Sequence, residues 1–369
     1  RGGMVTDRQE FLINMGPQHP STHGVFRLVL DLDGETVVSA EPEIGFLHRG
    51  MEKISENRTY EQVLPLTDRL DYLNSMGNNI AYTMAVEKLA GIEVPERALY
   101  IRVIMAELNR IASHLISIGT QGLEVGAYTV FLHCFRERER ILDLFEMASG
   151  ARLTYSYFRF GGVSQDLPDG WADEARAFLD LFLERVDEYE TLLIQNPIYI
   201  KRARDIGVIT SELALSYGAS GPVLRSTGIP WDLRKTDPYL VYDRFDFDIP
   251  VGERGDVWDR SWIRLEEMRQ SVAIIRQALD TMPAGPVQDG YSRYVVPPAG
   301  YAYVAVESPR GELGFFVVSD GGAKPFRLKV RSPAFVNLSL VTELVRGAKI
   351  ADVPLIIGSL DPVFGEVDR

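Results

Sequence analysis

The sequence predicts an α+β fold in which a central helical bundle lies between a small N-terminal antiparallel sheet and a mixed, strand-bearing C-terminal part. Apolar residues alternate as in strands within the first 50 residues. They recur at helical spacing from about residue 60 to 200, and short apolar runs separated by Gly and Pro fill the end of the chain. Helices and strands do not alternate regularly, which disfavours a doubly wound sheet.

The N-terminal sheet is predicted from alternation in one short segment. Phe26, Leu28 and Leu30 share one face of an expected strand. Asp33-Gly34 is a turn signal, and a second run follows from Thr36 to Ala40. We assign residues 1–58 to this β-rich region.

The helical core is assigned to residues 59–285, and its clearest helix is expected from about Trp258 to Met282. Apolar side chains recur there every three or four residues, which is typical of core packing. Pro283 and Gly285 end the pattern. The stripe consists of Trp258, Trp262, Leu265, Met268, Val272, Ile275 and Leu279.

The C-terminal region, residues 286–369, is expected to hold strands and to complete the core. Its short apolar runs are Tyr301–Val306, Phe315–Val318 and Arg327–Val330. Short apolar runs bounded by Gly and Pro favour strands over long helices.

Composition narrows the possible partners. The 52 acidic side chains outnumber the 39 basic ones, and the resulting net charge of -13 would repel a nucleic-acid backbone. No apolar stretch approaches the ~20 residues that cross a bilayer. The polar start, Arg1–Glu10, lacks the apolar core of a secretory signal. We therefore expect a soluble or peripheral protein of a reducing compartment, without a nucleic-acid partner.

The single cysteine, Cys134, lies among apolar residues in an expected helix. One cysteine cannot form a disulfide within the chain, and it cannot supply a cysteine-ligated zinc or iron–sulfur centre. We interpret Cys134 as a small core residue.

The loop Gly16–Gly24 is a candidate for chemistry because it carries His19 and His23. Imidazoles exchange protons near neutral pH, and the Gly and Pro residues around them can hold a defined loop. Two imidazoles alone do not establish a metal site. A polar turn and a functional loop are equally compatible with these residues.

The segment Thr67–Asn74 gathers polar groups just before an expected helix. Asp68 and Arg69 can simply cap that helix and form a solvated pair. Tyr72 can instead donate a hydrogen bond to a carbonyl ligand, because its phenol is protonated far above neutral pH.

Other charge patterns are interpreted as surface features. Glu107, Arg110 and His114 share one face of an expected helix, which predicts a surface charge stripe. The alternating charges of residues 136–140 predict a solvated helix face or a rim contact with another protein. Neither a phosphate-binding glycine motif nor a GxSxG elbow is present, which disfavours a nucleotide-binding dehydrogenase and acyl transfer by that route.

Several long segments together resemble the 49-kDa (D) subunit of respiratory complex I. The likeness extends from about residue 11 to the last residue, and the number and order of the segments make it specific. The segments are NMGPQHPSTHGVFRL, IGFLHRGMEK, TDRLDY, AVEKLAGIEVPERALYIRVIMAELNRIASHL, FRERERILDLFE, GIPWDLRKTDPY, GERGD and GSLDPVFGEVDR.

That family is related to the large subunits of nickel–iron hydrogenases, which implies a similar fold. The hydrogenase patterns RxCGxC and DPCxxC look like residues 69–74 and 361–366 of this chain. The resemblance implies that soft thiolate ligation of nickel is lost and that the former metal cavity admits a quinone headgroup. The residues at the four thiolate positions are Asp71, Asn74, Val363 and Glu366.

The resemblance also implies the site residues. His23 and Tyr72 would hydrogen-bond the two ends of the quinone headgroup, and Glu124, where the family usually has Asp, would pair with His23. Arg49 would lie near a 4Fe-4S cluster that is held by the adjacent subunit and supplies the electrons. This chain itself would ligate no metal. Tyr72 and His23 are chemically suited to supply protons to the reduced quinone.

The implied setting is a proton-translocating assembly at the cytoplasmic face of the cell membrane, with the chain as a peripheral subunit. The implied partners are the cluster-bearing 20-kDa (B), the 30-kDa (C), the membrane-embedded quinone-channel (H) and the 23-kDa ferredoxin-like (I) subunits. The upstream donor would be NADH, or else F420H2 or ferredoxin. Two alternatives are a membrane-bound hydrogenase-type catalytic subunit, which would need nickel-binding cysteines, and an inactive structural scaffold.

Two departures from the family pattern bear on these expectations. Thr154 stands where many members carry a histidine beside the cluster. The segment from Pro283 to Pro298 is shorter than in typical NADH-linked members and looks like that of F420H2-dehydrogenase relatives, unless residues are missing from the sequence.

Overall fold

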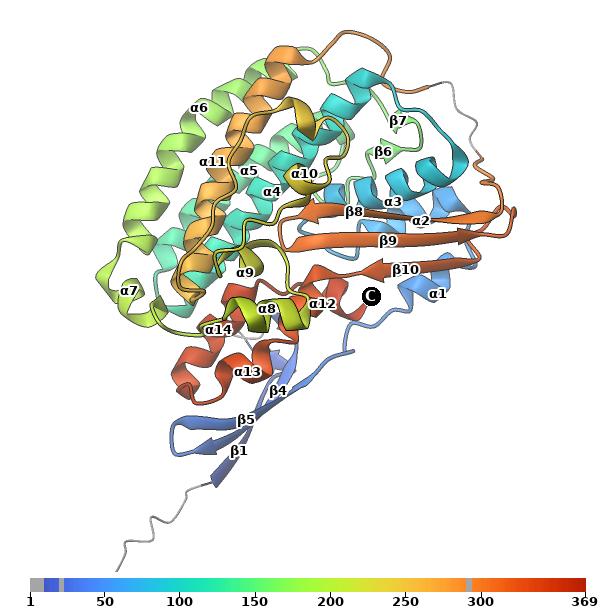
Figure 1. Ribbon diagram of the computed structural model, residues 1–369. Coiled ribbons are helices and arrows are strands. Elements are labelled where there is room, and N and C mark those ends of the chain that lie inside the picture. Colours follow the sequence, from blue (N-terminus) through green and yellow to red (C-terminus); the bar gives the residue numbers. More distant parts are fainter. Residues whose placement is uncertain (1–9, 20–22, 290–293) are drawn as a thin grey trace, which may run out of the picture.

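The structure is a computed structural model that describes residues 10–19, 23–289 and 294–369 (Figure 1). Residues 20–22 of the predicted histidine loop lie outside the described residues, as do residues 1–9 and 290–293. Small antiparallel sheets flank a body of helices, which confirms the predicted α+β class.

The N-terminal sheet is antiparallel with the order β1-β4-β5, and it projects from one end of the molecule (Figure 1). Phe26, Leu28 and Leu30 are fully buried, so the predicted inward face is confirmed. The predicted turn at Asp33-Gly34 joins two of the strands. The strands are β1 (Glu10–Met15), β4 (Arg27–Asp33) and β5 (Thr36–Glu43), and the histidine loop adds a two-stranded ladder of β2 (Gln18–His19) and β3 (Gly24–Val25).

The helical body contains four long helices that run alongside one another (Figure 1). They are α4 (Glu96–Glu124), α5 (Tyr128–Ser149), α6 (Trp171–Tyr189) and α11 (Val257–Thr281). The helix expected at 258–282 is therefore confirmed as α11. The apolar stripe of α11 is buried from Leu265 onward, whereas Trp258 and Trp262 are partly buried and stack on each other.

Shorter elements connect these helices. They are α1 (Met51–Ser55), α2 (Tyr60–Thr67), α3 (Ser75–Ala90), β6 (Phe158–Arg159), β7 (Gly162–Val163), a π-helix (Glu190–Ile194), α7 (Pro197–Ala203), α8 (Ser211–Tyr217), α9 (Gly221–Arg225), α10 (Leu233–Thr236) and a 3-10 turn (Tyr242–Arg244).

The C-terminal part forms a second three-stranded antiparallel sheet, of order β10-β9-β8, against which α3 packs. The three predicted apolar runs lie in these strands. The elements are β8 (Gly300–Ser308), β9 (Gly311–Ser319), β10 (Arg327–Arg331), α12 (Pro333–Leu338), α13 (Val341–Val345), a 3-10 turn (Ile350–Asp352), α14 (Val353–Leu360) and α15 (Phe364–Asp368).

The N-terminal sheet contacts the C-terminal part of the chain. The Val37 amide donates to the Ala348 carbonyl at 2.9 Å, so β5 is held against the C-terminal helices. The packing of α3 on β8 joins the helical and C-terminal parts. The division at residues 58 and 285 stays a prediction about the organisation of the chain.

Within the described residues, no helix is both long and apolar enough to span a membrane.

Cys134 is fully buried among apolar side chains, as expected of a core residue. The alternating charges of residues 136–140 form only part of a solvated face, because Glu137 is buried and accepts a hydrogen bond from Tyr189 at 2.5 Å.

The predicted surface stripe on α4 is wrong. Glu107, Arg110 and His114 are buried, because α11 packs over this face of α4 and brings compensating charge with it. Glu267 of α11 accepts from His114 Nε2 at 2.8 Å and from Arg225 at 2.6 Å.

The buried network continues on both sides of Glu267. Glu107 accepts hydrogen bonds from Tyr242 and Ser271, each at 2.6 Å, and pairs with Arg234 at 3.2 Å. Arg225 also bonds the carboxylate of Glu307 at 2.8 Å. Each charge is thus matched inside the protein, which is the condition under which a buried charge is tolerated.

Replacing Glu267 with Leu is expected to lower the free energy of unfolding by ~3–5 kcal/mol, because Arg225 would keep a buried charge with less compensation. Urea denaturation of the purified chain measures this change. The matched control is Glu343→Ala, which removes an exposed pair with Arg346 and should cost at most ~1 kcal/mol. Equal costs at the two positions would contradict the network described here.

Candidate functional site

His23 and Glu124 meet near the end of α4. His23 Nε2 lies 3.6 Å from Glu124 Oε1, and the two side chains are only 13% and 11% exposed. The backbone of His23 has a left-handed φ of 50°, just before β3. The fold therefore brings together two residues that are far apart in the sequence, as the resemblance implied, and their roles stay predictions.

The imidazole of His23 lies against the backbone of α14 at Gly358. A Cβ at that position would come within 2.9 Å of His23 Nε2 and 3.2 Å of Cε1, so only glycine leaves room for the ring. Burial lowers the pKa of His23, while the negative charge of Asp361 acts in the opposite direction. His23 is therefore neutral at neutral pH, and no hydrogen-bond partner of its buried Nε2 is found in the part of the chain described.

Tyr72 lies in the short loop between α2 and α3, and its side chain is 37% exposed. Burial, and then the negative charge of Asp71, raises the pKa of Tyr72, against the opposing charges of Arg310 and Arg49. The hydroxyl keeps its proton and is available as a hydrogen-bond donor.

The interpretation of Asp68 and Arg69 as a helix cap and a solvated pair is wrong for Asp68. Asn74, not Asp68, occupies the N-cap of α3, and Asp68 is buried, where it accepts from the Ser156 amide at 3.1 Å. Burial is the main cause that raises the pKa of Asp68 to about 7.

Arg310 anchors the Tyr72 loop from the turn between β8 and β9. Its fully buried guanidinium bonds Asp71 Oδ2 at 2.6 Å, Ser113 Oγ at 3.0 Å and the Asp361 carbonyl at 3.0 Å. This residue was not predicted from the sequence. The Pro309-Arg310-Gly311 turn between two predicted strands was a weak signal, and the sequence alone does not show that the turn points inward.

Arg49 joins the same loop to the last helix. Its guanidinium donates to the Arg69 carbonyl at 2.7 Å and to the Gly365 carbonyl at 3.2 Å. A Cβ at Gly365 would lie 2.6 Å from the Leu70 carbonyl, so glycine is required for this close approach. The predicted position of Arg49 beside a partner's cluster stays a prediction.

The four positions that correspond to the hydrogenase thiolates lie in this same region. Asp71 and Glu366 influence each other's charge, and Val363 is buried just before α15. The Asn74 side chain packs against Gly77. Within the described residues, no group of His, Cys, Asp and Glu is arranged to hold a metal ion.

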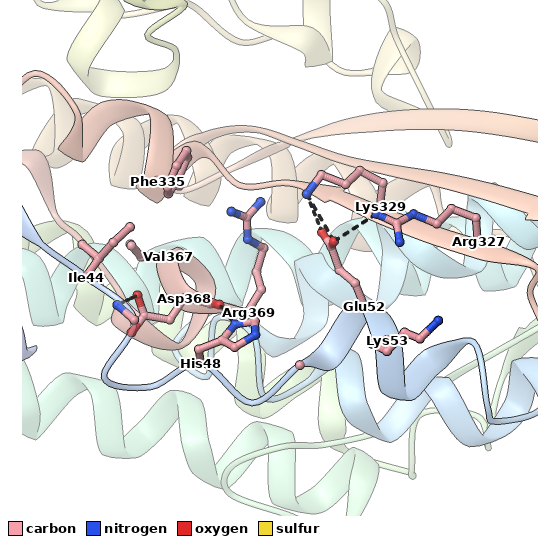
Figure 2. Close-up of a pocket in the computed structure, with 12 residues that line it drawn as sticks. Ile44, His48, Glu52, Lys53, Arg327, Lys329, Phe335, Val367, Asp368 and Arg369 are labelled. Atoms are coloured by element: carbon pink, nitrogen blue, oxygen red, sulfur yellow. Dashed lines mark hydrogen bonds and ion pairs between the residues drawn. The ribbon is translucent and has the colours of Figure 1, made fainter.

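A separate pocket of about 390 Å³ lies beside the C-terminus (Figure 2). Glu52 pairs with Lys329 at 2.9 Å in its wall, and His48 Nδ1 lies 2.7 Å from the Asp368 carbonyl. None of His23, Tyr72 and Glu124 lines it. Its lining includes His48 and Gly50, which flank Arg49, and Val367 and Asp368 of α15.

Known proteins resemble the chain over nearly its whole length. The family model described as "Respiratory-chain NADH dehydrogenase, 49 Kd subunit" matches residues 124–299 and 289–369. The NADH-quinone oxidoreductase D subunit of Desulforamulus reducens is 54% identical over 365 residues, which cover 99% of this chain and 100% of the relative. The protein of the same name from Carboxydothermus hydrogenoformans is 52% identical over 360 residues, covering 98% and 99%. That of Geotalea uraniireducens is 51% identical over 382 residues, covering 97% and 98%.

Replacing Gly358 with Ala is expected to push the His23 ring out of its buried position and so to raise its pKa toward the solvent value of ~6.5. NMR titration of the five histidines measures this shift. Alanine is a better helix former than glycine, so α14 itself should not be weakened.

Gly119→Ala is the matched control for this experiment. Gly119 also lies within a helix, but its added Cβ would make only ordinary contacts of 3.4 Å or more. It should leave the His23 titration unchanged. An unaltered titration in Gly358→Ala would show that His23 does not lie against α14.

Proposed function

The chain belongs to the 49-kDa subunit family of respiratory-chain NADH dehydrogenase, and on this premise we propose that it forms the site where a membrane quinone is reduced. The observation that carries the proposal is a pair of hydrogen-bonding groups near the Arg310–Asp361 contact, since the charge of Asp361 acts on His23 and that of Arg310 acts on Tyr72. One is the buried, unpartnered Nε2 of His23, and the other is the protonated hydroxyl of Tyr72. Quinone carbonyl oxygens accept hydrogen bonds from such donors.

The surrounding charges suit a reaction that adds electrons to the quinone. Reduction takes up two electrons and two protons, and negative charge develops on the quinone oxygens before the protons arrive. The positive charges of Arg310 and Arg49 act on the Tyr72 hydroxyl and favour its release of a proton. Tyr72 then supplies one proton as a general acid.

His23 supplies the second proton in this proposal. Its lowered pKa keeps the imidazole neutral until negative charge appears beside it, and that charge favours uptake of a proton from water. Glu124, 3.6 Å away, stabilises the resulting imidazolium. The imidazolium then gives its Nε2 proton to the quinone oxygen, and the site has delivered two protons.

The electrons come from a 4Fe-4S cluster of the adjacent 20-kDa (B) subunit, with Arg49 on the side that faces it. The other proposed partners are the 30-kDa (C), quinone-channel (H) and 23-kDa (I) subunits. We place the assembly at the cytoplasmic face of the cell membrane, where its membrane arm translocates protons.

NADH is the upstream donor that the relatives favour over F420H2 or ferredoxin. The relative from Desulforamulus reducens is named for NADH, and it aligns over its whole length within 365 residues. A relative that is named for NADH therefore has a chain as compact as this one. The short segment from Pro283 to Pro298 is not by itself a sign of another donor.

Replacing Tyr72 with Phe is expected to reduce quinone reductase activity of the assembled complex by roughly 10²-fold or more, because the general acid is lost together with its hydrogen bond to the quinone. The phenyl ring keeps the packing of the loop. Tyr301→Phe is the control, because Tyr301 is exposed on β8, and it should retain full activity. Unchanged activity in Tyr72→Phe would contradict the proposed site and favour a purely structural role for the chain.

A further inference from the structure

Glu366 is a buried carboxyl group that takes no part in the proposed reduction of the quinone. It lies on α15 and is fully buried. Its Oε2 accepts a hydrogen bond from the Ala334 amide at 3.2 Å. Its Oε1 is buried and has no hydrogen-bond partner in the described part of the chain. A carboxylate in this position would be poorly compensated.

The charges around Glu366 do not balance if every carboxyl group is ionised. Asp71, Asp361 and Glu366 surround Arg310, which bonds Asp71 at 2.6 Å and Asp361 at 3.5 Å. The second guanidinium, that of Arg264, lies 4.0 Å from Asp361. Within this cluster three carboxylates face two guanidinium groups, which leaves one excess negative charge, because the guanidinium of Arg49 is bonded to the backbone carbonyls of Arg69 and Gly365. One bound proton removes that charge.

Glu366 is the member of the cluster that holds this proton. Burial raises the pKa of Asp71 as well, but both of its oxygens have donors: Oδ2 accepts from Arg310 at 2.6 Å and Oδ1 from the Leu73 amide at 3.0 Å. Asp361 faces two guanidinium groups. Burial and the charge of Asp71 raise the pKa of Glu366 to about 8, against Arg310, the Ala334 amide and the Ser332 hydroxyl.

We propose that Glu366 stores a proton and passes it, through Asp71, to Tyr72 after Tyr72 has protonated the reduced quinone. The inference rests on the proposed function and identifies the group that returns a proton to Tyr72 after each reduction. In the first step the O–H bond of Tyr72 breaks and its proton joins a quinone oxygen, which leaves a phenolate. In the second, Glu366 gives its proton to the Asp71 carboxylate, and the Asp71 carboxyl group formed in this way then gives a proton to the phenolate. Tyr72 and Asp71 are restored, and Glu366 is left as a carboxylate that solvent later reprotonates.

The direction of transfer follows from the proton affinities. The pKa of Glu366 is about 8, whereas that of Tyr72 lies above the ordinary value of a phenol, so the proton moves downhill to the phenolate. Asp71 precedes Tyr72 in the chain, and its charge acts on both Tyr72 and Glu366. The groups facing the cluster come from six parts of the chain. They are Asp71 and Tyr72 from the loop before α3, Arg310 from the β8–β9 turn, Ser332 at the N-cap of α12 and Ala334 within it, Arg264 from α11, Asp361 after α14, and Arg49 beside Gly365.

Infrared spectroscopy of the oxidised, assembled complex tests whether Glu366 holds the proton. We expect a C=O stretch of a protonated carboxylic acid that titrates near pH 8 and is missing in Glu366→Gln. Glu343→Gln, at an exposed pair, should keep the band. Asp71→Asn should keep it as well but lower its pKa, because the neighbouring negative charge is gone. If no band depends on Glu366 or responds to Asp71→Asn, the inference is overturned, and the second variant decides the matter even if Glu366→Gln fails to assemble.

Transient kinetics separate this inference from the proposed function. In Glu366→Gln the first quinone should be reduced at the normal rate, because Tyr72 still carries its proton, while continued turnover falls on the order of tenfold or more. Tyr72→Phe should already slow the first reduction. Normal continued turnover in Glu366→Gln would overturn the proton store and leave the quinone site intact. A normal first reduction in Tyr72→Phe would instead contradict the quinone site.

Discussion

The contact between Arg310 and the carboxylate of Asp71 is the interaction on which the candidate site depends. At 2.6 Å and fully buried, it holds the loop of Tyr72 against the β8–β9 turn. The same guanidinium reaches Ser113 of α4 and the carbonyl of Asp361, so one side chain fixes three parts of the chain that are far apart in sequence. Loss of the guanidinium would leave buried carboxylates without compensation, at a cost of several kcal/mol.

The rest of the site follows from the placement of that charge. Arg310 and Arg49 hold the C-terminal segment through hydrogen bonds to the carbonyls of Asp361 and Gly365. As a result, α14 packs against His23 and α15 packs against the Asp71 loop. Burial then sets the protonation states. It keeps the His23 imidazole neutral and the Tyr72 phenol protonated, and it raises the pKa of Glu366 to about 8. A single packing arrangement thus fixes the shape of the candidate site, and in the proposed reaction it also prepares the groups that donate protons.

The elements that could be predicted from the sequence are those with a strong local period. The strand that contains Leu30 and the helix α11 carry their pattern within a few residues or turns. Leu28 and Leu30 lie in β4 as expected, and the helix expected at 258–282 is observed at Val257–Thr281. The burial of Glu107, Arg110 and His114 could not be predicted, because the partners that neutralise them, such as Glu267, lie far away in the sequence. A charge stripe on a helix looks the same in sequence whether water or another helix covers it.

The candidate site likewise contains residues that could be predicted from the sequence and residues that could not. His23, Tyr72 and Glu124 could be named only through the family resemblance, since two histidines in a loop and one tyrosine beside charged residues carry little signal alone. Arg310 and Gly358 were missed because their importance lies in tertiary contacts. Asp68 was placed at a helix cap, which ordinary local rules favour, whereas the fold buries it. Glu366 was identified only as a lost thiolate position, and its protonation depends on charges from other segments.

Binding of the quinone headgroup between His23 and Tyr72 is tested most directly by a structure of the assembled complex with a bound quinone analogue. We expect the two carbonyl oxygens of the analogue within hydrogen-bond distance of His23 Nε2 and the Tyr72 hydroxyl, at about 2.7–3.2 Å. A headgroup seated instead in the pocket lined by Ile44 and His48, away from both side chains, would contradict this binding mode.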